Sequence, residues 1–155
     1  MERVGTTSQQ LVQTVAAGFC SIGPVQLVVS WPVLDRLGVV LQREFSVSDD
    51  AVQDIVQAIA RIAEAGPDMH APYVLLGGTG VLPLRDIEDR HVLETALAGK
   101  ADVLVTSNFD DFLPPRSVVV ERGELAIVRR DGHQVIIAHP RQMRRWLNAG
   151  AITLP

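Results

Sequence analysis

The sequence contains a single cysteine, Cys20, which excludes an internal disulfide and makes a reducing cytoplasm the expected compartment. Glycine, proline or charged residues interrupt every apolar run well before the ~20 residues that a membrane span requires. The opening residues Met1-Glu2-Arg3 lack the pattern of a signal peptide. These absences predict a cytoplasmic protein with no membrane contact.

The sequence does contain enough apolar residues for a folded core. Hydrophobic residues make up 47% of the 155 residues and the mean hydropathy is +0.20, which excludes an intrinsically disordered chain. A chain of this length buries roughly two-thirds of the surface that it exposes when unfolded. We therefore expect a single domain over residues 1–155 that needs no disulfide and no structural metal.

The net charge of −4 is unevenly distributed. Residues 1–115 hold 7 Lys and Arg against 15 Asp and Glu, whereas residues 116–155 hold 7 Arg against 3 acids. Five of the arginines could guide a phosphate backbone toward an acidic site: Arg129, Arg130, Arg141, Arg144 and Arg145. The other two interpretations are solvated surface side chains and contact with an acidic partner protein.

Apolar periodicity predicts the elements along the chain. Helices are expected at residues 7–18, 31–41, 48–65 and 140–147, and strands at residues 25–29, 72–76, 118–120, 125–128 and 134–138. Asp131-Gly132 between the last two strands predicts a hairpin. The glycine-rich turn at residues 77–80 suggests a nucleotide site as an alternative, but Pro83 stands where its third glycine is needed.

The most informative segment is residues 85–112. Asp89 precedes the apolar positions of a short helix that ends near Gly99, and residues 102–106 follow as an apolar strand. In an α/β fold the strand exit and the helix start meet at one sheet edge, where ligands bind. The polar residues expected at that edge are Asp89, Thr106, Asn108, Asp110 and Asp111. Acids at a helix start, such as Asp86 and Asp89, also stabilise the helix without any function.

In order and spacing, this segment resembles the second half of PIN-domain ribonucleases, including the toxins of VapC type. Asp86-Ile87-Glu88-Asp89 matches the family's Asp-x-x-Asp helix start, and Ala101-Asp102-Val103-Leu104-Val105-Thr106 matches its Ala-Asp-x-Leu-Val-Thr strand. Ser107-Asn108-Phe109-Asp110-Asp111-Phe112 follows as the Asp/Asn cluster. Residues 27–37 look like the family's second strand, its serine and the helix that carries a metal-site acid.

The resemblance implies a three-layer α/β/α sandwich with a mainly parallel sheet, followed by a C-terminal β-hairpin and helix. It implies an endoribonuclease that hydrolyses RNA phosphodiesters with Mg²⁺ or Mn²⁺ and acts as the toxin of a toxin–antitoxin pair. The implied partners are an RNA substrate, an antitoxin protein and a second copy of the chain in a homodimer.

The resemblance also implies the metal ligands. Asp89 is the first candidate, and Asp35, in place of the family's usual Glu, is the second. Asp110 and Asp111 compete for a further position, and the Asn-x-x-Asp-Phe ending favours Asp111. For Asp35, a solvated carboxylate near a helix N-terminus is an equally good interpretation.

Two further residues belong to the implied catalytic set. Asn108 and Thr106 would orient the site or its water. The metal would polarise the phosphate and lower the pKa of the attacking water.

One part of the family pattern is missing. The family's chain opens with a strand ending in Asp-x-Asn, whose aspartate is normally the first metal ligand, but the only acid before Asp35 is Glu2. Two explanations are a start codon placed too far downstream and a repurposed copy with fewer strands. The second supports an alternative function, a catalytically inactive, truncated PIN-like binding protein or remnant.

Overall fold

The computed structural model describes residues 6–73 and 87–155, without the side chains of residues 87–89, 111 and 112. Residues 74–76 of an expected strand, the glycine-rich turn and Asp86 lie outside the described residues. The described helices are α1 (Thr7–Ala17), α2 (Trp31–Phe45), α3 (Asp49–Glu64), α4 (Ile87–Ala98), the 3₁₀ helix η1 (Phe109–Phe112) and α5 (Pro140–Ala149). The described strands are β1 (Phe19–Cys20), β2 (Gly23–Pro24), β3 (Val103–Val105), β4 (Val118–Glu121), β5 (Leu125–Arg130) and β6 (His133–Ala138).

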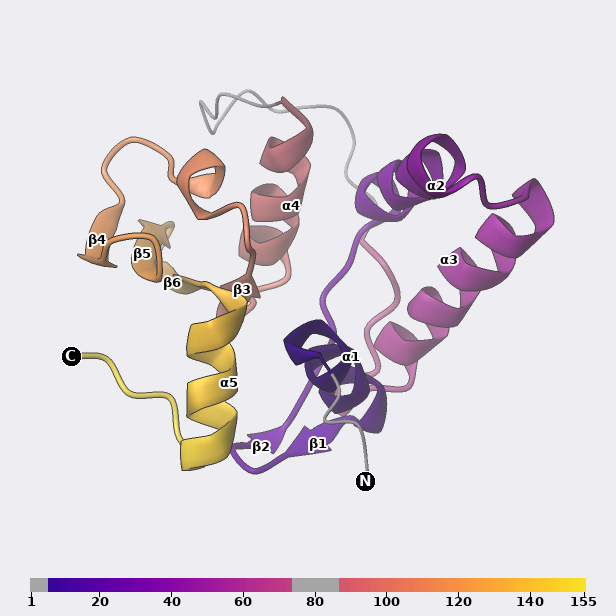
Figure 1. Cartoon of the computed structure of the whole chain (residues 1–155). Helices are drawn as coiled ribbons and strands as arrows, with labels where there is room; N and C mark the ends of the chain where they lie inside the picture. The colour runs from indigo at the N-terminus through magenta and orange to yellow at the C-terminus, as the bar shows by residue number, and fades with distance from the viewer. Residues whose placement is uncertain (1–5, 74–86) are drawn as a thin grey trace.

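The main sheet has the strand order β3-β6-β5-β4 (Figure 1). β3 runs parallel to β6, whereas the β6–β5 and β5–β4 pairs are antiparallel. The predicted hairpin turn forms, because Asp131 and Gly132 have φ angles of 50° and 77°, as a type I′ turn requires. β6 pairs with β3 as well as with β5, so the hairpin is part of the sheet. The described sheet is therefore mixed, and it does not confirm the expected mainly parallel sheet.

Residues 25–29 do not form the strand that their apolar run predicts. The one bridge at the end of this segment is parallel and joins Ser30 to Tyr73. Tyr73 N–H donates to Val29 O at 3.0 Å, and Trp31 N–H donates to Tyr73 O at 3.1 Å. A strand requires pairing along its length, and an isolated bridge does not supply it. The prediction of a strand here is wrong.

α2 and α3 form the helical hairpin that the periodicity predicts. Ser30 caps α2, because its hydroxyl accepts a hydrogen bond from Val33 N–H at 3.4 Å. Ser48 caps α3 in the same way. The buried residues between the two helices are Leu34, Val52, Val56 and Ala60. The hairpin is therefore held by a small apolar core of its own.

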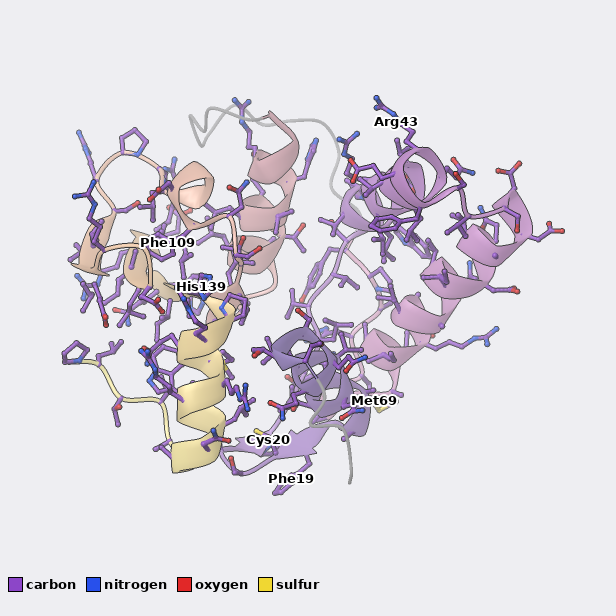
Figure 2. All side chains as sticks on the ribbon, viewed as in Figure 1. Phe19, Cys20, Arg43, Met69, Phe109 and His139 are labelled. Carbon is purple, nitrogen blue, oxygen red and sulfur yellow. The ribbon has the colours of Figure 1, made fainter. Side chains whose placement is uncertain are left out.

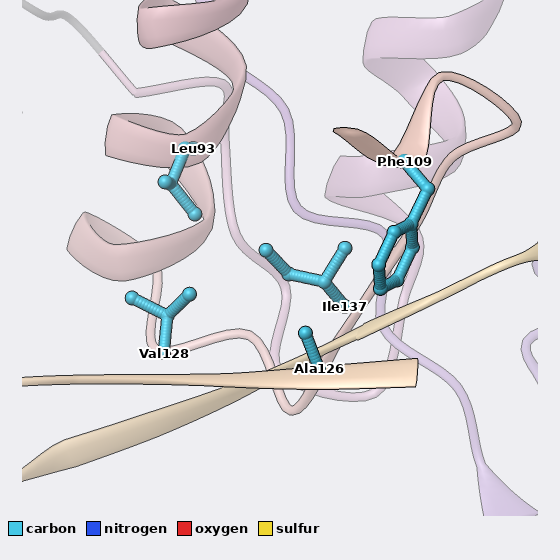
Figure 3. Close-up of a cluster of buried hydrophobic side chains, with 5 residues drawn as sticks. All are labelled: Leu93, Phe109, Ala126, Val128 and Ile137. Atoms are coloured by element: carbon cyan, nitrogen blue, oxygen red, sulfur yellow. The ribbon is translucent and has the colours of Figure 1, made fainter. Parts of the chain in front are cut away.

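The sheet is covered on both faces. The cluster against α4 and η1 comprises Leu93, Phe109, Ala126, Val128 and Ile137 (Figure 3). The cluster against α5 comprises Leu125, Ile136, Ala138 and Trp146. Neighbouring residues along β5 and β6 thus face opposite sides, as the alternation of a strand dictates. The fold is α/β, with α4 and α5 on opposite sides of the sheet (Figure 1).

α1 lies against α5. Thr6 and Gln9 form a capping box at the start of α1, but none of the residues of α1 is buried. Two long-range hydrogen bonds tie this region to α5: Arg144 Nη1 donates to Thr7 Oγ1 at 3.3 Å, and Ser21 Oγ donates to Leu147 O at 2.5 Å. The first described helix is therefore held by the last one.

Candidate functional site

A buried hydroxyl pair joins the N-cap of α2 to the middle of α4. Ser30 Oγ and Thr95 Oγ1 lie 2.7 Å apart, and the two residues are 0% and 3% exposed. Thr95 Oγ1 donates to the backbone oxygen of His91 at 2.6 Å. Since a hydroxyl carries one proton, Ser30 is the donor to Thr95. This chain of hydrogen bonds fixes α2, which carries Asp35, against α4, which begins near Asp89.

A close backbone approach supports the same contact. A Cβ atom at Gly99, just after α4, would overlap Val28 Cγ1 and lie 3.0 Å from Tyr73 Cε2. Only glycine allows the end of α4 to lie so near residues 28 and 73. α4 therefore contacts the segment before α2 at two levels, through Thr95 and through Gly99.

A pocket of about 80 Å³ lies between the two helices, and we call it the α2–α4 pocket. It is lined by Pro32, Val33 and Arg36 of α2 and by His91 and Val92 of α4. Asp35 precedes Arg36 on α2 and is exposed. Asp35 itself is not among the residues that line the pocket.

The polar atoms of α4 near this pocket are incompletely satisfied. His91 Nδ1 is buried and lies 3.9 Å from Glu94 Oε2, which is beyond hydrogen-bond length. Within the described part of the chain, His91 Nδ1 and the neighbouring Arg90 Nε are buried without a hydrogen-bond partner. Buried unsatisfied nitrogens are uncommon in folded proteins and call for a specific explanation.

The exit of β3 is held by a local turn and by one aromatic side chain. Thr106 N–H donates to Ala138 O at 3.0 Å, and Thr106 Oγ1 accepts a hydrogen bond from Asn108 N–H at 3.1 Å. Phe109, 4% exposed, anchors η1 in the core (Figures 2 and 3). The exposed side chains of Asn108 and Asp110 flank this anchor. The Asn108 side chain makes no capping hydrogen bond to η1.

The structure describes the predicted metal ligands unequally. Asp35 and Asp110 are exposed on α2 and η1. The backbone of Asp89 lies in the first turn of α4 and that of Asp111 in η1, but their side chains lie outside the described ones. Within the described residues, no three His, Cys, Asp or Glu side chains are grouped to hold a metal ion. The elements themselves do come together, since α4 contacts both α2 and η1.

Sequence reasoning missed two residues of this region, Thr95 and His91. Thr95 is a polar residue next to the apolar face of α4, which was a usable signal, because a buried threonine needs a hydrogen-bond partner. The sequence could not identify Ser30 as that partner, since the two residues are 65 positions apart. His91 belongs to no sequence motif. Its place in the pocket lining and its buried, unsatisfied Nδ1 identify it in the structure.

Most of the arginines of the basic C-terminal part bond within the chain. Arg141 pairs with Glu124 at 2.7 Å, and Arg145 donates to Gln142 at 3.2 Å. Arg129 donates to Gln134 at 3.1 Å. Arg144, as described above, bonds to Thr7. These contacts fit the interpretation of structural surface arginines, and their action on RNA stays a prediction.

Comparison with known families gives one match. Residues 6–110, more than half of the chain, match the family described as PIN domain. No curated protein matches the chain, and no solved structure matches it. In the described ranges, no helix has the length and apolarity to cross a membrane. Because residues 6–110 match this family, the chain belongs to the PIN domain family.

Proposed function

We propose that this chain is a metal-dependent endoribonuclease that hydrolyses RNA phosphodiesters with Mg²⁺ or Mn²⁺. PIN domains are generally nucleases that bind RNA and use divalent metals, which supports a nuclease role. The observation that carries the proposal is the family match itself, because it spans Asp35, Asp89, Asn108 and Asp110. The contacts of α4 with α2 and η1 support it, because they bring the elements that carry these residues together.

The donor chemistry fits a hard cation. Carboxylate, amide and hydroxyl oxygens are the groups that Mg²⁺ and Mn²⁺ prefer, and Asp35, Asp110 and Asn108 present such oxygens at the surface. We assign Asp89, Asp35, Asp111 and Asp110 as candidate ligands. When bound, the metal supplies a polarised phosphate and an activated water.

The chain's own polar residues then have defined tasks. The Asn108 amide can donate to a phosphate oxygen or to the attacking water, because it is exposed and uncommitted to the helix cap. Thr106 positions Asn108 by accepting its backbone N–H. Ser30 and Thr95 hold α2 and α4 at a fixed separation, and preorganisation of this kind lowers the barrier for a positioned reaction.

The proposal extends to the biological setting. We infer a cytoplasmic toxin that an antitoxin protein inhibits and that forms a homodimer, built as a three-layer α/β/α sandwich. Exposed apolar side chains on the α2–α3 hairpin support a partner surface: Val39, Phe45 and Ile55 are 39%, 67% and 36% exposed.

The test is cleavage of a mixed single-stranded RNA by purified protein with Mg²⁺, Mn²⁺ or a chelator. The Asp89→Asn variant is compared with Asp54→Asn, a control on the exposed side of α3. We expect metal-dependent cleavage by the wild type and the control, and its loss in Asp89→Asn. Absence of cleavage by the wild type with either metal would falsify the proposed function and leave a non-catalytic binding protein.

A further inference from the structure

Three polar residues lie side by side at the end of the sheet where β3 and β6 finish and β5 begins. Val105 of β3 pairs with Ala138 of β6, and Thr106 N–H continues this pairing by donating to Ala138 O at 3.0 Å. His139 follows β6, and its N–H donates to Glu124 O at 2.8 Å, one position beyond the β5–β6 ladder. Thr106, His139 and Glu124 therefore form a row across this end of the sheet, in which neighbouring strands lie about 4.8 Å apart.

The row continues the face of the sheet that α4 and η1 cover. Along β6, Ile137 packs in the cluster on that face, whereas Ala138 packs in the cluster on α5. His139 has an extended backbone and lies where β6 gives way to α5 (Figure 2), so the alternation of the strand returns it to the side of Ile137. Thr106, beside it in the row, accepts a hydrogen bond from Asn108 N–H at 3.1 Å. His139 thus adjoins the turn that carries two residues of the proposed site.

A hydrogen bond at the start of α5 fixes the tautomer of His139. Its Nδ1 accepts from Arg141 N–H at 3.2 Å, so Nδ1 carries no proton and the neutral ring has its proton on Nε2. Among the described residues Nε2 has no hydrogen-bond partner, and unlike His91 Nδ1 it is not buried. The half-buried ring therefore presents one N–H donor to solvent at this end of the sheet.

The carboxylate in the row has its charge balanced by an arginine. Glu124 Oε1 lies 2.7 Å from Arg141 Nη2. The side chain of Glu124 is 15% exposed and that of Arg141 is 64% exposed, so solvent meets mainly the guanidinium group. Phosphate oxygens only accept hydrogen bonds, and imidazole and guanidinium N–H groups are suitable donors to them. A phosphodiester at this end of the sheet would meet the donors of His139 and Arg141 before the carboxylate.

We propose that His139 binds a phosphate of the RNA next to Thr106, through a hydrogen bond from Nε2–H to a phosphate oxygen. This inference rests on the proposed function, because it takes RNA as the ligand. His139, Glu124 and Arg141 lie outside residues 6–110, the part that matches the family. The contact is therefore supplied by this chain's C-terminal hairpin and helix, and Arg141 orients the ring that makes it.

The test measures binding without cleavage. Fluorescence anisotropy in excess chelator gives the affinity for a labelled single-stranded RNA, and for the same RNA with one uncharged methylphosphonate linkage placed at each position in turn. His139→Ser removes the ring but keeps an acceptor for the start of α5, because serine is a preferred N-cap. His139→Asn, a second variant, also keeps the cap, and its amide is too short to reach the position of Nε2.

The matched control is His133→Ser, the same change at the other end of β6. His133 Nε2 lies 2.9 Å from Ala101 O, so this ring contributes a contact within the protein and none at the row. Thermal unfolding checks that each variant folds.

We expect His139→Ser and His139→Asn to bind the intact RNA about tenfold more weakly than the wild type, and His133→Ser less than about twofold more weakly. At one position, the methylphosphonate should weaken wild-type binding about tenfold and leave binding by the two His139 variants nearly unchanged, because their contact with that phosphate is already absent.

Equal affinities of the wild type and the His139 variants, an equal loss in His133→Ser, or no RNA binding at all overturns the inference even if the protein cleaves RNA. The same holds if no methylphosphonate position depends on His139. A position that does depend on His139 upholds the inference even if no cleavage is found, so the two proposals fail independently.

Discussion

Ser30 Oγ lies 2.7 Å from Thr95 Oγ1 in the interior, and this hydrogen bond joins the start of α2 to the middle of α4. Thr95→Val keeps the side-chain shape but leaves the Ser30 hydroxyl without its acceptor, so we expect it to lower the free energy of unfolding by about 1–3 kcal/mol. Ser30→Ala should cost more, because it also removes the cap of α2. Urea unfolding measures both effects.

The double variant provides the control for this pair. Since the two hydroxyls share one hydrogen bond, the double variant should lose less than the sum of the single losses, by about 0.5–3 kcal/mol. Strict additivity would show that the two side chains do not interact.

Phe109 anchors the polar end of the site in the core. Phe109→Ala removes a side chain that is 4% exposed and should cost about 3–5 kcal/mol. Cleavage should fall as well, because η1 presents Asn108 and Asp110. Phe19→Ala is the matched control: Phe19 projects from β1 (Figure 2) and is 65% exposed, so its loss should change stability by at most about 0.5 kcal/mol. Equal effects of the two substitutions in chemical unfolding would contradict the described core.

A substitution at Asp35 should affect cleavage without affecting stability. As an exposed helical carboxylate, it should tolerate Asp35→Asn with a change of less than about 0.5 kcal/mol in unfolding free energy. If it binds the metal, the same change should lower the cleavage rate at least about tenfold. The comparison is with Asp54→Asn under identical metal concentrations. A fully active Asp35→Asn variant would remove Asp35 from the ligand set and leave a solvated surface carboxylate.

Gly99 marks the closest approach of α4 to the segment before α2. Gly99→Ala places a methyl group against Val28 and Tyr73, the latter at 3.0 Å, and should destabilise the protein by about 1–3 kcal/mol. Ala98→Ser, one residue earlier and exposed, should be nearly neutral. Thermal unfolding distinguishes the two, and a neutral Gly99→Ala would show that the segment can move away.

The helices were predictable wherever the signal is local. The apolar periods of α2, α3 and α5, and the Asp131-Gly132 turn between β5 and β6, all act within a few residues, and the structure confirms them. The strand predicted at residues 25–29 does not form, because strand formation does not depend on local signals alone. An apolar run indicates burial, but strand pairing depends on residues far away in the sequence. Among the described residues, Tyr73 pairs with Ser30 at the end of this segment.

The candidate site was predictable to a similar degree. The motif run at residues 85–112 was enough to find the family, whereas the roles of Asp35, Asp89, Asn108 and Asp110 stay predictions. The α2–α4 pocket was not predictable, because Val33 and His91 come from helices far apart in the sequence. In the sequence, neither residue has a feature that distinguishes it from other residues of its helix.

The attachment of α1 to α5 has a consequence for the order of folding. The hydrogen bond from Ser21 to Leu147 closes a loop of 126 residues, and the cost of such closure is met only when the intervening chain is already compact. During synthesis, α1 therefore emerges from the ribosome long before its docking surface exists. Until α5 is made, α1 has no helix to dock against, and its apolar residue Val12 stays 65% exposed even after docking.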